Sequence, residues 1–258
     1  MPSGSQSPQS FQSSQSSQSS RLAQSAQSAQ SAQPSQPSLT ERRKSETRLD
    51  IARTAAALFV ADGLRATRAE DIARAAGVAP RTFYRYFATK EESVAPLFAA
   101  GAQQWAEAVR RAPAELSVPD ALRHAVADAL GAHDAGAAES LDWVRALLRM
   151  SAESPALRSV WADACHASEQ TLLAVLAERA GARGPADADS AGPDPAGPGL
   201  DLRLAAAVAS AAVRVAVESW AENWSETRAP GGESADASDG PAALAARCLT
   251  ALDAFPWP

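Results

Sequence analysis

The chain has 258 residues, of which 46% are hydrophobic and 5% aromatic, and its formal net charge at pH 7 is −6. Alanine is abundant and favours helices, whereas strands are enriched in β-branched and aromatic residues, so the composition predicts an all-α protein. The length allows one large domain or two modest ones. No apolar run is long enough to span a bilayer and no apolar signal segment is present, which predicts a cytoplasmic protein.

The charges are divided unevenly along the chain. Residues 41–90 carry 11 Lys/Arg and 6 Asp/Glu, a net charge of +5, whereas residues 91–258 carry 12 Lys/Arg and 24 Asp/Glu, a net charge of −12. A basic segment joined to an acidic body predicts that one end binds a polyanion and that the body binds something else.

The first 40 residues differ from the remainder in composition. They hold 15 Ser and 10 Gln in a loose three-residue repeat. Such a segment has too few apolar side chains to offset the entropy lost on ordering, so we expect residues 1–40 to be a disordered tail.

A helical pattern begins at Glu41 and is closed by Gly63, as a helix C-terminus often is. Thr67, with Glu70 three residues later, predicts a capping box at the start of a helix over 69–76. That helix is expected to stop at Gly77.

A short third helix is predicted over Pro80–Tyr86, because proline suits the first position of a helix. The helices over 69–76 and 80–86 are joined by a tight turn with a glycine, the arrangement of a helix-turn-helix. Ile72 and Phe83 are expected to close its small core.

The outward side of the short helix carries the expected chemistry. Arg81, Tyr84 and Arg85 lie at positions i, i+3 and i+4 and therefore share one face. An arginine can donate two hydrogen bonds to the edge of guanine in the major groove, and hydroxyl groups and lysine can bind the phosphates. This face is predicted to bind double-stranded DNA.

Residues 48–92 resemble the N-terminal domain of TetR-type (tetracycline repressor-like) regulators. The resemblance is carried by Arg48-Leu-Asp-Ile-Ala, Asp71-Ile72-Ala73, Ala76-Gly77-Val78, the run Thr82 to Phe87, and Lys90-Glu91-Glu92. It implies an all-helical homodimer with a three-helix DNA-binding domain and a larger domain that holds a ligand pocket and a dimer-forming helix pair.

In that family, residues matching Thr82, Tyr84 and Lys90 usually contact phosphates, and the position matching Arg81 often contacts bases. Arg68 stands where a smaller residue is more common, so it is either a base contact or a phosphate contact. We predict the following DNA-binding residues: Arg48, Thr67, Arg68, Arg81, Thr82, Tyr84, Arg85, Tyr86 and Lys90.

The remainder of the chain is predicted to be helical, with loops at the Gly/Pro-rich stretches 182–199 and 228–240. The expected domains are the tail over 1–40, the DNA-binding domain over 41–90, and an effector-binding and dimerisation domain over 91–258. The expected helices cover residues 90–111 (with a bend at Pro96), 119–135, 139–152, 155–181, 200–226 and 241–254.

The helix over 139–152 is apolar around most of its circumference, which indicates that it is buried. Large aromatic residues and a methionine near it can line an apolar ligand cavity or belong to an ordinary core. The predicted pocket residues are Trp105, Trp143, Leu147, Met150 and Trp161. The segment 147–158 also resembles effector domains of TetR relatives that sense acyl-CoA or hydrophobic compounds.

Small residues follow one side of the helix over 200–226 and allow another helix to approach closely. Packing against a symmetry mate would give a four-helix dimer interface, as the resemblance implies, and packing within one chain is the alternative. The predicted interface residues are Ala209, Ala212, Ala216, Trp220, Leu244, Cys248 and Leu252.

No catalytic or metal-binding motif is found, and no cofactor is predicted. His124, His133 and His166 are expected to be surface or helix residues, and Cys165 and Cys248 to be small buried side chains.

The sequence therefore predicts a ligand-responsive repressor that is not an enzyme. It is expected to bind a palindromic operator as a homodimer and to be released by a small hydrophobic effector. The alternatives are a ligand-independent DNA-binding protein that recruits a protein partner, and a helical binding protein or enzyme with a vestigial DNA-binding domain.

Overall fold

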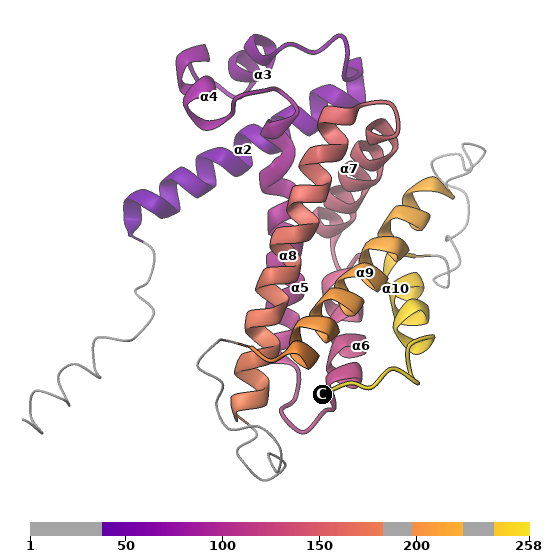
Figure 1. Cartoon of the computed structure of the whole chain (residues 1–258). Helices are drawn as coiled ribbons and strands as arrows, with labels where there is room; N and C mark the ends of the chain where they lie inside the picture. Colours follow the sequence, from indigo (N-terminus) through magenta and orange to yellow (C-terminus); the bar gives the residue numbers. More distant parts are fainter. Residues whose placement is uncertain (1–37, 183–197, 224–239) are drawn as a thin grey trace, which may run out of the picture. The chain divides into compact units, whose positions relative to one another are not determined.

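The computed structural model describes residues 38–182, 198–223 and 240–258, and every regular element in these ranges is a helix (Figure 1). The all-α prediction is therefore confirmed for this part of the chain. Residues 1–37 of the predicted tail over 1–40 lie outside the described residues, as do most of both predicted loops. Leu39 and Thr40 belong to a helix rather than to the predicted disordered tail. Residues 1–44 and 45–258 form two units.

The helices follow one another without an intervening strand in the described ranges. They are α2 (Leu39–Asp62), α3 (Ala69–Ala75), α4 (Pro80–Tyr86), the 3₁₀ turn η2 (Glu92–Val94), α5 (Ala95–Arg111), α6 (Val118–Ala129), α7 (Ala135–Ser151), α8 (Pro155–Ala182), α9 (Leu200–Glu222) and α10 (Pro241–Thr250). The predicted bounds of α4 agree with the structure, and those of α3 and α8 differ by one residue at one end.

The start of α3 differs from the predicted capping box. The N-cap is Arg68 rather than Thr67, and the Asp71 carboxylate accepts a hydrogen bond from the Arg68 backbone N–H (3.3 Å). The Thr67 hydroxyl instead donates to the carbonyl oxygen of Gly63 (3.0 Å). Thr67 is thus used to close the loop after α2, so the carboxylate one position beyond Glu70 caps the helix.

The predicted helix over 90–111 is divided into two elements. Residues Glu92–Val94 form the 3₁₀ turn, and α5 then begins at Ala95 with Pro96 in its first turn. Proline lacks an N–H and suits a helix start, so it marks the beginning of α5 rather than the predicted bend.

The boundary between α6 and α7 lies earlier than predicted. Helix α6 ends at Ala129, and α7 begins at Ala135 instead of residue 139. Asp134 explains the new start, because its carboxylate accepts a hydrogen bond from the Ala137 N–H (2.8 Å) and caps the helix.

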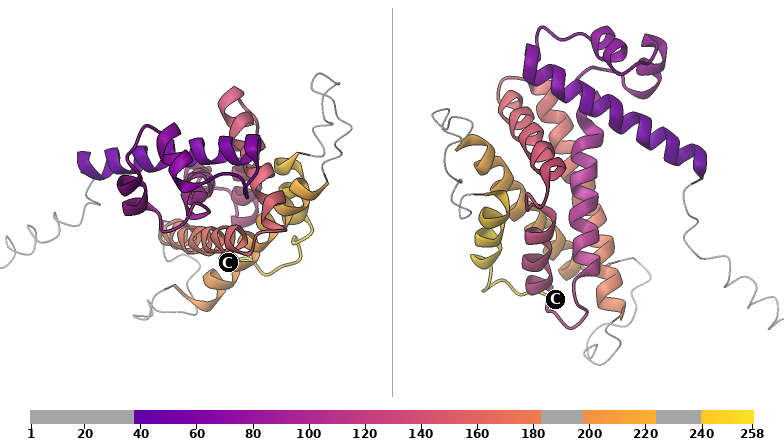
Figure 2. Two further views of the ribbon diagram at one scale, coloured as in Figure 1. Left: turned by 90° about the horizontal axis from the view of Figure 1, so that it is seen from above. Right: turned by 180° about the vertical axis from the view of Figure 1, so that it is seen from behind.

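Helices α5 and α8 run side by side in the larger unit, and α10 packs against α9 (Figure 2). The buried Arg179 of α8 forms hydrogen bonds with the C-terminal end of α5. Its guanidinium donates to the carbonyl oxygens of Val109 (3.2 Å), Ala112 (2.7 Å) and Pro113 (2.9 Å). These carbonyls have no partner within α5, so a cation at this helix C-terminus satisfies them.

One apolar cluster connects the helix-turn-helix region with the remainder of the unit. It contains the buried Phe59, Ile72 and Phe83, together with Leu147 of α7 and Leu157 of α8. The adjacent Leu148 belongs to a different cluster with Trp220 of α9. Helix α7 therefore packs into two cores at once through neighbouring residues.

Candidate nucleic-acid interface and ligand cavity

The turn between α3 and α4 has a defined hydrogen-bond pattern. Gly77 has φ +68°, the Gly77 N–H donates to Arg74 O (3.2 Å), and the Val78 N–H donates to Ala73 O (2.9 Å). This is a Schellman motif, in which glycine takes the left-handed conformation at little cost. The predicted helix-turn-helix geometry is thus present, with Phe83 fully buried beneath α4.

The outward face of α4 is cationic and exposed. Arg81 and Arg85 are exposed, and Thr82 is half-buried. The Arg85 guanidinium lies 5.1 Å from the centre of the Tyr86 ring, a cation–π contact. Arg81 makes no ion pair or hydrogen bond with the described residues, so its full hydrogen-bonding capacity is available.

Tyr84 is held by a carboxylate on the neighbouring helix. Its hydroxyl donates to Glu70 Oε1 (3.0 Å), and this hydrogen bond is the largest cause of the raised pKa of the Tyr84 phenol. A phenol has a single proton to donate, so Tyr84 cannot donate to Glu70 and to a phosphate at the same time.

Two residues that were predicted to contact DNA, Thr67 and Lys90, interact within the protein at the loop after α2. Thr67 is buried, and the Lys90 ammonium donates to the carbonyl oxygens of Leu64 (2.6 Å) and Thr67 (2.9 Å). Lys90 retains one N–H for another acceptor, because an ammonium group has three. Lys90 therefore links the loop after α2 to the turn between α4 and η2.

The other predicted contacts lie around the same region. Arg68 is exposed at the start of α3, whereas Tyr86 is half-buried against Phe87. The Arg48 guanidinium lies 5.5 Å from the centre of the Phe87 ring. The DNA-binding role of all nine residues remains a prediction.

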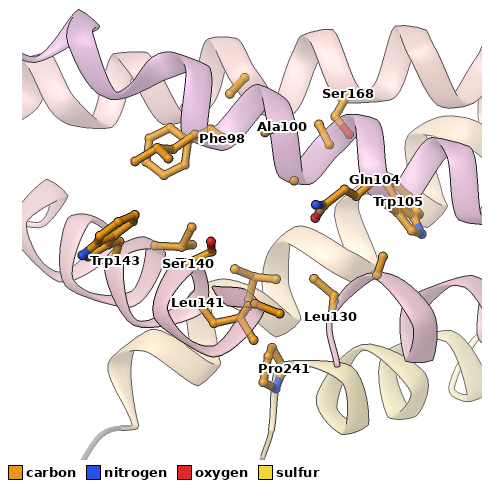
Figure 3. Close-up of a pocket in the computed structure, with 18 of the residues that line it drawn as sticks. Phe98, Ala100, Gln104, Trp105, Leu130, Ser140, Leu141, Trp143, Ser168 and Pro241 are labelled. Atoms are coloured by element: carbon orange, nitrogen blue, oxygen red, sulfur yellow. The ribbon is translucent and has the colours of Figure 1, made fainter. Parts of the chain in front are cut away.

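A cavity of about 630 Å³ lies in the larger unit, bounded mainly by α5, α7, α8 and α9 (Figure 3). Its lining is mostly apolar and includes Phe98, Leu130, Leu141 and Val217. Pockets that bind small molecules usually measure about 300–1,000 Å³ and have such linings. The cavity is thus large enough for a small organic ligand.

Three of the five predicted pocket residues line this cavity, namely Trp105, Trp143 and Trp161. Leu147 is fully buried in the cluster shared with the helix-turn-helix region, and Met150 packs against that cluster. These two are core residues in the structure.

Leu49 and Arg53 of α2 line the cavity, although sequence reasoning placed no pocket residue there. They follow Arg48 within the segment that resembles a DNA-binding domain. The local sequence pattern therefore indicated a place in that domain and gave no sign of a contact with the cavity. Gln104 was missed as well, since a single polar residue on an amphipathic helix has no distinctive signal.

The predicted dimer residues occupy two environments. Ala209, Ala216 and Trp220 are buried within the chain, and Ala212 together with α10 residues Leu244 and Cys248 is half-buried beside the core. Leu252, beyond α10, is also half-buried. The apolar residues that α9 leaves exposed are different ones, including Leu204 (47%), Ala211 and Val215 (46%).

Other candidate chemistry is sparse in the described ranges. No group of three His, Cys, Asp or Glu side chains there has a metal-binding arrangement, and no helix there is both long and apolar enough to cross a membrane. Cys165 lines the cavity, and burial raises the pKa of its thiol to about 12, so this thiol stays protonated.

Comparison with known proteins identifies the N-terminal region. Residues 51–94 match the family model for bacterial regulatory proteins of the tetR family. Over 145 residues, which are 55% of this chain and 64% of the relative, the sequence is 32% identical to the HTH-type transcriptional regulator TcmR of Streptomyces glaucescens. The chain thus spans less than two thirds of the length of the curated relatives that it matches.

Two solved structures are also similar to the chain, each with a TM-score below 0.5. PfmR of Thermus thermophilus, a TetR family transcriptional regulator, is 20% identical with a TM-score of 0.41, covering 78% of this chain and 94% of its own. FadR of Thermus thermophilus, a TetR family repressor solved with lauroyl-CoA, is 20% identical with a TM-score of 0.46, covering 80% and 92%.

Proposed function

We propose that this chain, a member of the tetR family of bacterial regulatory proteins, is a ligand-responsive repressor that binds a palindromic operator. The observation that carries the proposal is the exposed cationic face of α4, supported from below by a buried core and a Schellman turn. Arg81 contacts base edges, and Thr82, Tyr84 and Lys90 contact phosphates. A helix placed in the major groove by such a turn is the usual docking geometry of this motif.

The effector binds in the cavity between α5, α7, α8 and α9. Leu49 and Arg53 of α2 line this cavity, while their neighbours Ile51, Ala52 and Ala55 belong to the core that contains Phe83. A ligand that contacts α2 differently in two conformations shifts the population between them. The recognition helix α4 then moves with the core on which it is packed. The two recognition helices of the dimer no longer have the spacing of the two operator half-sites.

The functional unit is a homodimer, formed through the exposed apolar side of α9. Leu204, Ala211 and Val215 are spaced by seven and four residues and so lie on one side of this helix. The buried Ala209 and Ala216 support that helix from inside by letting it pack closely on its own chain.

Selection of bound duplexes from a random pool tests the DNA-binding proposal. We expect a palindrome with half-sites about one helical turn, ~34 Å, apart, and an affinity that falls steeply with salt. A protein that retains no duplex even at low salt would contradict the proposal.

Sedimentation analysis tests the dimer independently. Val215→Glu places a charge in the proposed interface, so we expect a shift from dimer to monomer. Val60→Glu is the matched control, because Val60 is 50% exposed on α2 and Val215 is 46% exposed on α9. Equal behaviour of the two variants would exclude this side of α9 as the interface.

A further inference from the structure

The walls of the cavity favour a flat ligand. Phe98, Trp105, Trp143 and Trp161 all contribute to the lining, and the rings of Phe98 and Trp161 meet edge to face with their centres 5.1 Å apart. Aromatic rings gain from stacked and edge-to-face contacts with other rings in addition to the burial of apolar area. A fused-ring molecule therefore fits these walls better than a flexible chain does.

The charged groups of the lining disfavour an anionic ligand. Its two arginines are already paired, Arg53 with Asp50 (3.3 Å) and Arg214 with Glu218 (3.0 Å). The lining also contains the carboxylates Asp134 and Glu139, which repel an anion. Burying an anion without a partner is costly, so the cavity disfavours negatively charged molecules.

The polar groups that remain in the wall are neutral. The Gln104 amide extends from α5 toward the space between α5 and α7 (Figure 3), and it has no hydrogen bond with the described residues. It can donate from its NH₂ group to an acceptor on a ligand.

The next residue also carries a donor, but that donor is buried. Trp105 is 4% exposed, and its indole Nε1 is buried with no acceptor among the described residues. By contrast, the Nε1 of Trp161 donates to Glu218 Oε1 (2.7 Å). An indole N–H can only donate, so a ligand that satisfies it must bring an acceptor. Because Trp105 Nε1 is buried, Gln104 is the amide donor of the lining, beside the hydroxyls of Ser140 and Ser168.

We propose that the effector is a flat fused-ring molecule without a negative charge, whose carbonyl oxygen accepts a hydrogen bond from the Gln104 amide. This inference rests on the proposed function of the cavity as the effector site. It narrows the ligands of that site from any hydrophobic compound to fused-ring compounds that carry a carbonyl group.

Calorimetric titration of the full chain with a matched pair of probes tests the inference. The probes are 2-acetylnaphthalene and 2-ethylnaphthalene, which differ by a carbonyl in place of a methylene. We expect the ketone to bind about five-fold more tightly, the usual net effect of one hydrogen bond. Sodium 2-naphthoate, which has the same ring and a negative charge, should bind at least about ten-fold more weakly than the ketone.

Neighbouring glutamines give a matched pair of variants. Gln104→Leu should abolish the preference for the ketone while retaining the affinity for 2-ethylnaphthalene. Gln103→Leu should keep the preference, because Gln103 is exposed on the same helix but does not line the cavity. The carbonyl stretching frequency of the bound ketone, measured by infrared difference spectroscopy, should fall in the native chain and return toward its value in hexane in Gln104→Leu.

Three results would overturn the inference: a ketone preference that persists in Gln104→Leu, naphthoate binding as tight as that of the ketone, or no binding of any probe. The duplex selection described above uses no ligand. A chain that selects a palindrome and binds no probe would thus lose this inference alone, whereas a chain that binds the ketone and no duplex would lose the proposed repressor function.

Discussion

The recognition helix α4 and the ligand cavity differ in whether their arginines form ion pairs. Arg81 on α4 is exposed and forms no ion pair with the described residues, whereas the cavity arginines Arg53 and Arg214 are held by Asp50 and Glu218. Exposed ion pairs contribute little to stability, but they determine which arginines remain available to bind a negatively charged partner. An available arginine suits a polyanion, whereas paired arginines leave a cavity poorly suited to anionic ligands.

Both regions nevertheless depend on one core. Phe83 beneath α4 and Leu157 at the start of α8 belong to the same buried cluster. Disturbing that cluster should therefore affect both regions, and changes at their surfaces should affect only one of them.

The largest effect is expected from Phe83→Ala. Removing this fully buried ring should lower the free energy of unfolding by about 3–5 kcal/mol. Thermal or urea unfolding measures the loss, and both DNA binding and probe binding should weaken. Tyr84→Ala, one residue along and 51% exposed, is the control. Equal stabilities of the two variants would show that α4 is not packed as described.

Arg81→Ala should separate the two regions. We expect specific DNA binding to weaken by about 1–3 kcal/mol, with reduced selectivity at one base pair. Probe binding in the cavity should not change. Fluorescence anisotropy with the selected duplex measures the effect, and Arg203→Ala, which removes an exposed cation of α9, is the control. Unchanged affinity and selectivity would remove Arg81 from the interface.

Glu70→Gln should strengthen DNA binding by about two- to ten-fold, the range of one hydrogen bond. The substitution replaces the charge-assisted hydrogen bond between the Tyr84 hydroxyl and Glu70 with a weaker neutral one, so a phosphate competes more readily for this hydroxyl. A double-mutant cycle with Tyr84→Phe provides the control. If Glu70→Gln has the same effect in the Tyr84→Phe background, its charge alone is responsible and the proposed competition does not occur.

The smallest effect concerns pH. Burial raises the pKa of the Cys165 thiol to about 12 from its ordinary value of 9.0, so its contribution to stability is complete below about pH 9 and is lost as the pH rises toward 12. Alkylation of Cys165 by iodoacetamide, followed by peptide mass spectrometry, should stay slow between pH 7 and 9 and become fast in urea. Labelling of the native chain that is as fast as in urea and levels off above about pH 9, as it does for an ordinary thiol, would contradict this environment.

Local sequence determined much of the helix-turn-helix region. Gly77, Pro80 and the spacing of Ile72 and Phe83 act through backbone geometry and helical period, which are properties of neighbouring residues. The bounds of α4 and the left-handed Gly77 follow from them directly. The capping residue of α3 did not follow from local sequence, because the Thr67 hydroxyl donates a hydrogen bond to the Gly63 carbonyl oxygen across the preceding loop.

The sequence predicted that large aromatic residues line an apolar cavity. Only the tertiary structure decided which residues form its walls. The periodicity of α7 indicates a buried helix but does not distinguish Trp143, which lines the cavity, from Leu147, which lies in the core. The same holds for α9, where Ala209 is buried within the chain and Val215 is left exposed. A helical period shows which residues share a side. The partner of that side depends on helices distant in sequence, such as α2, whose Phe59 shares a buried cluster with Leu147 of α7.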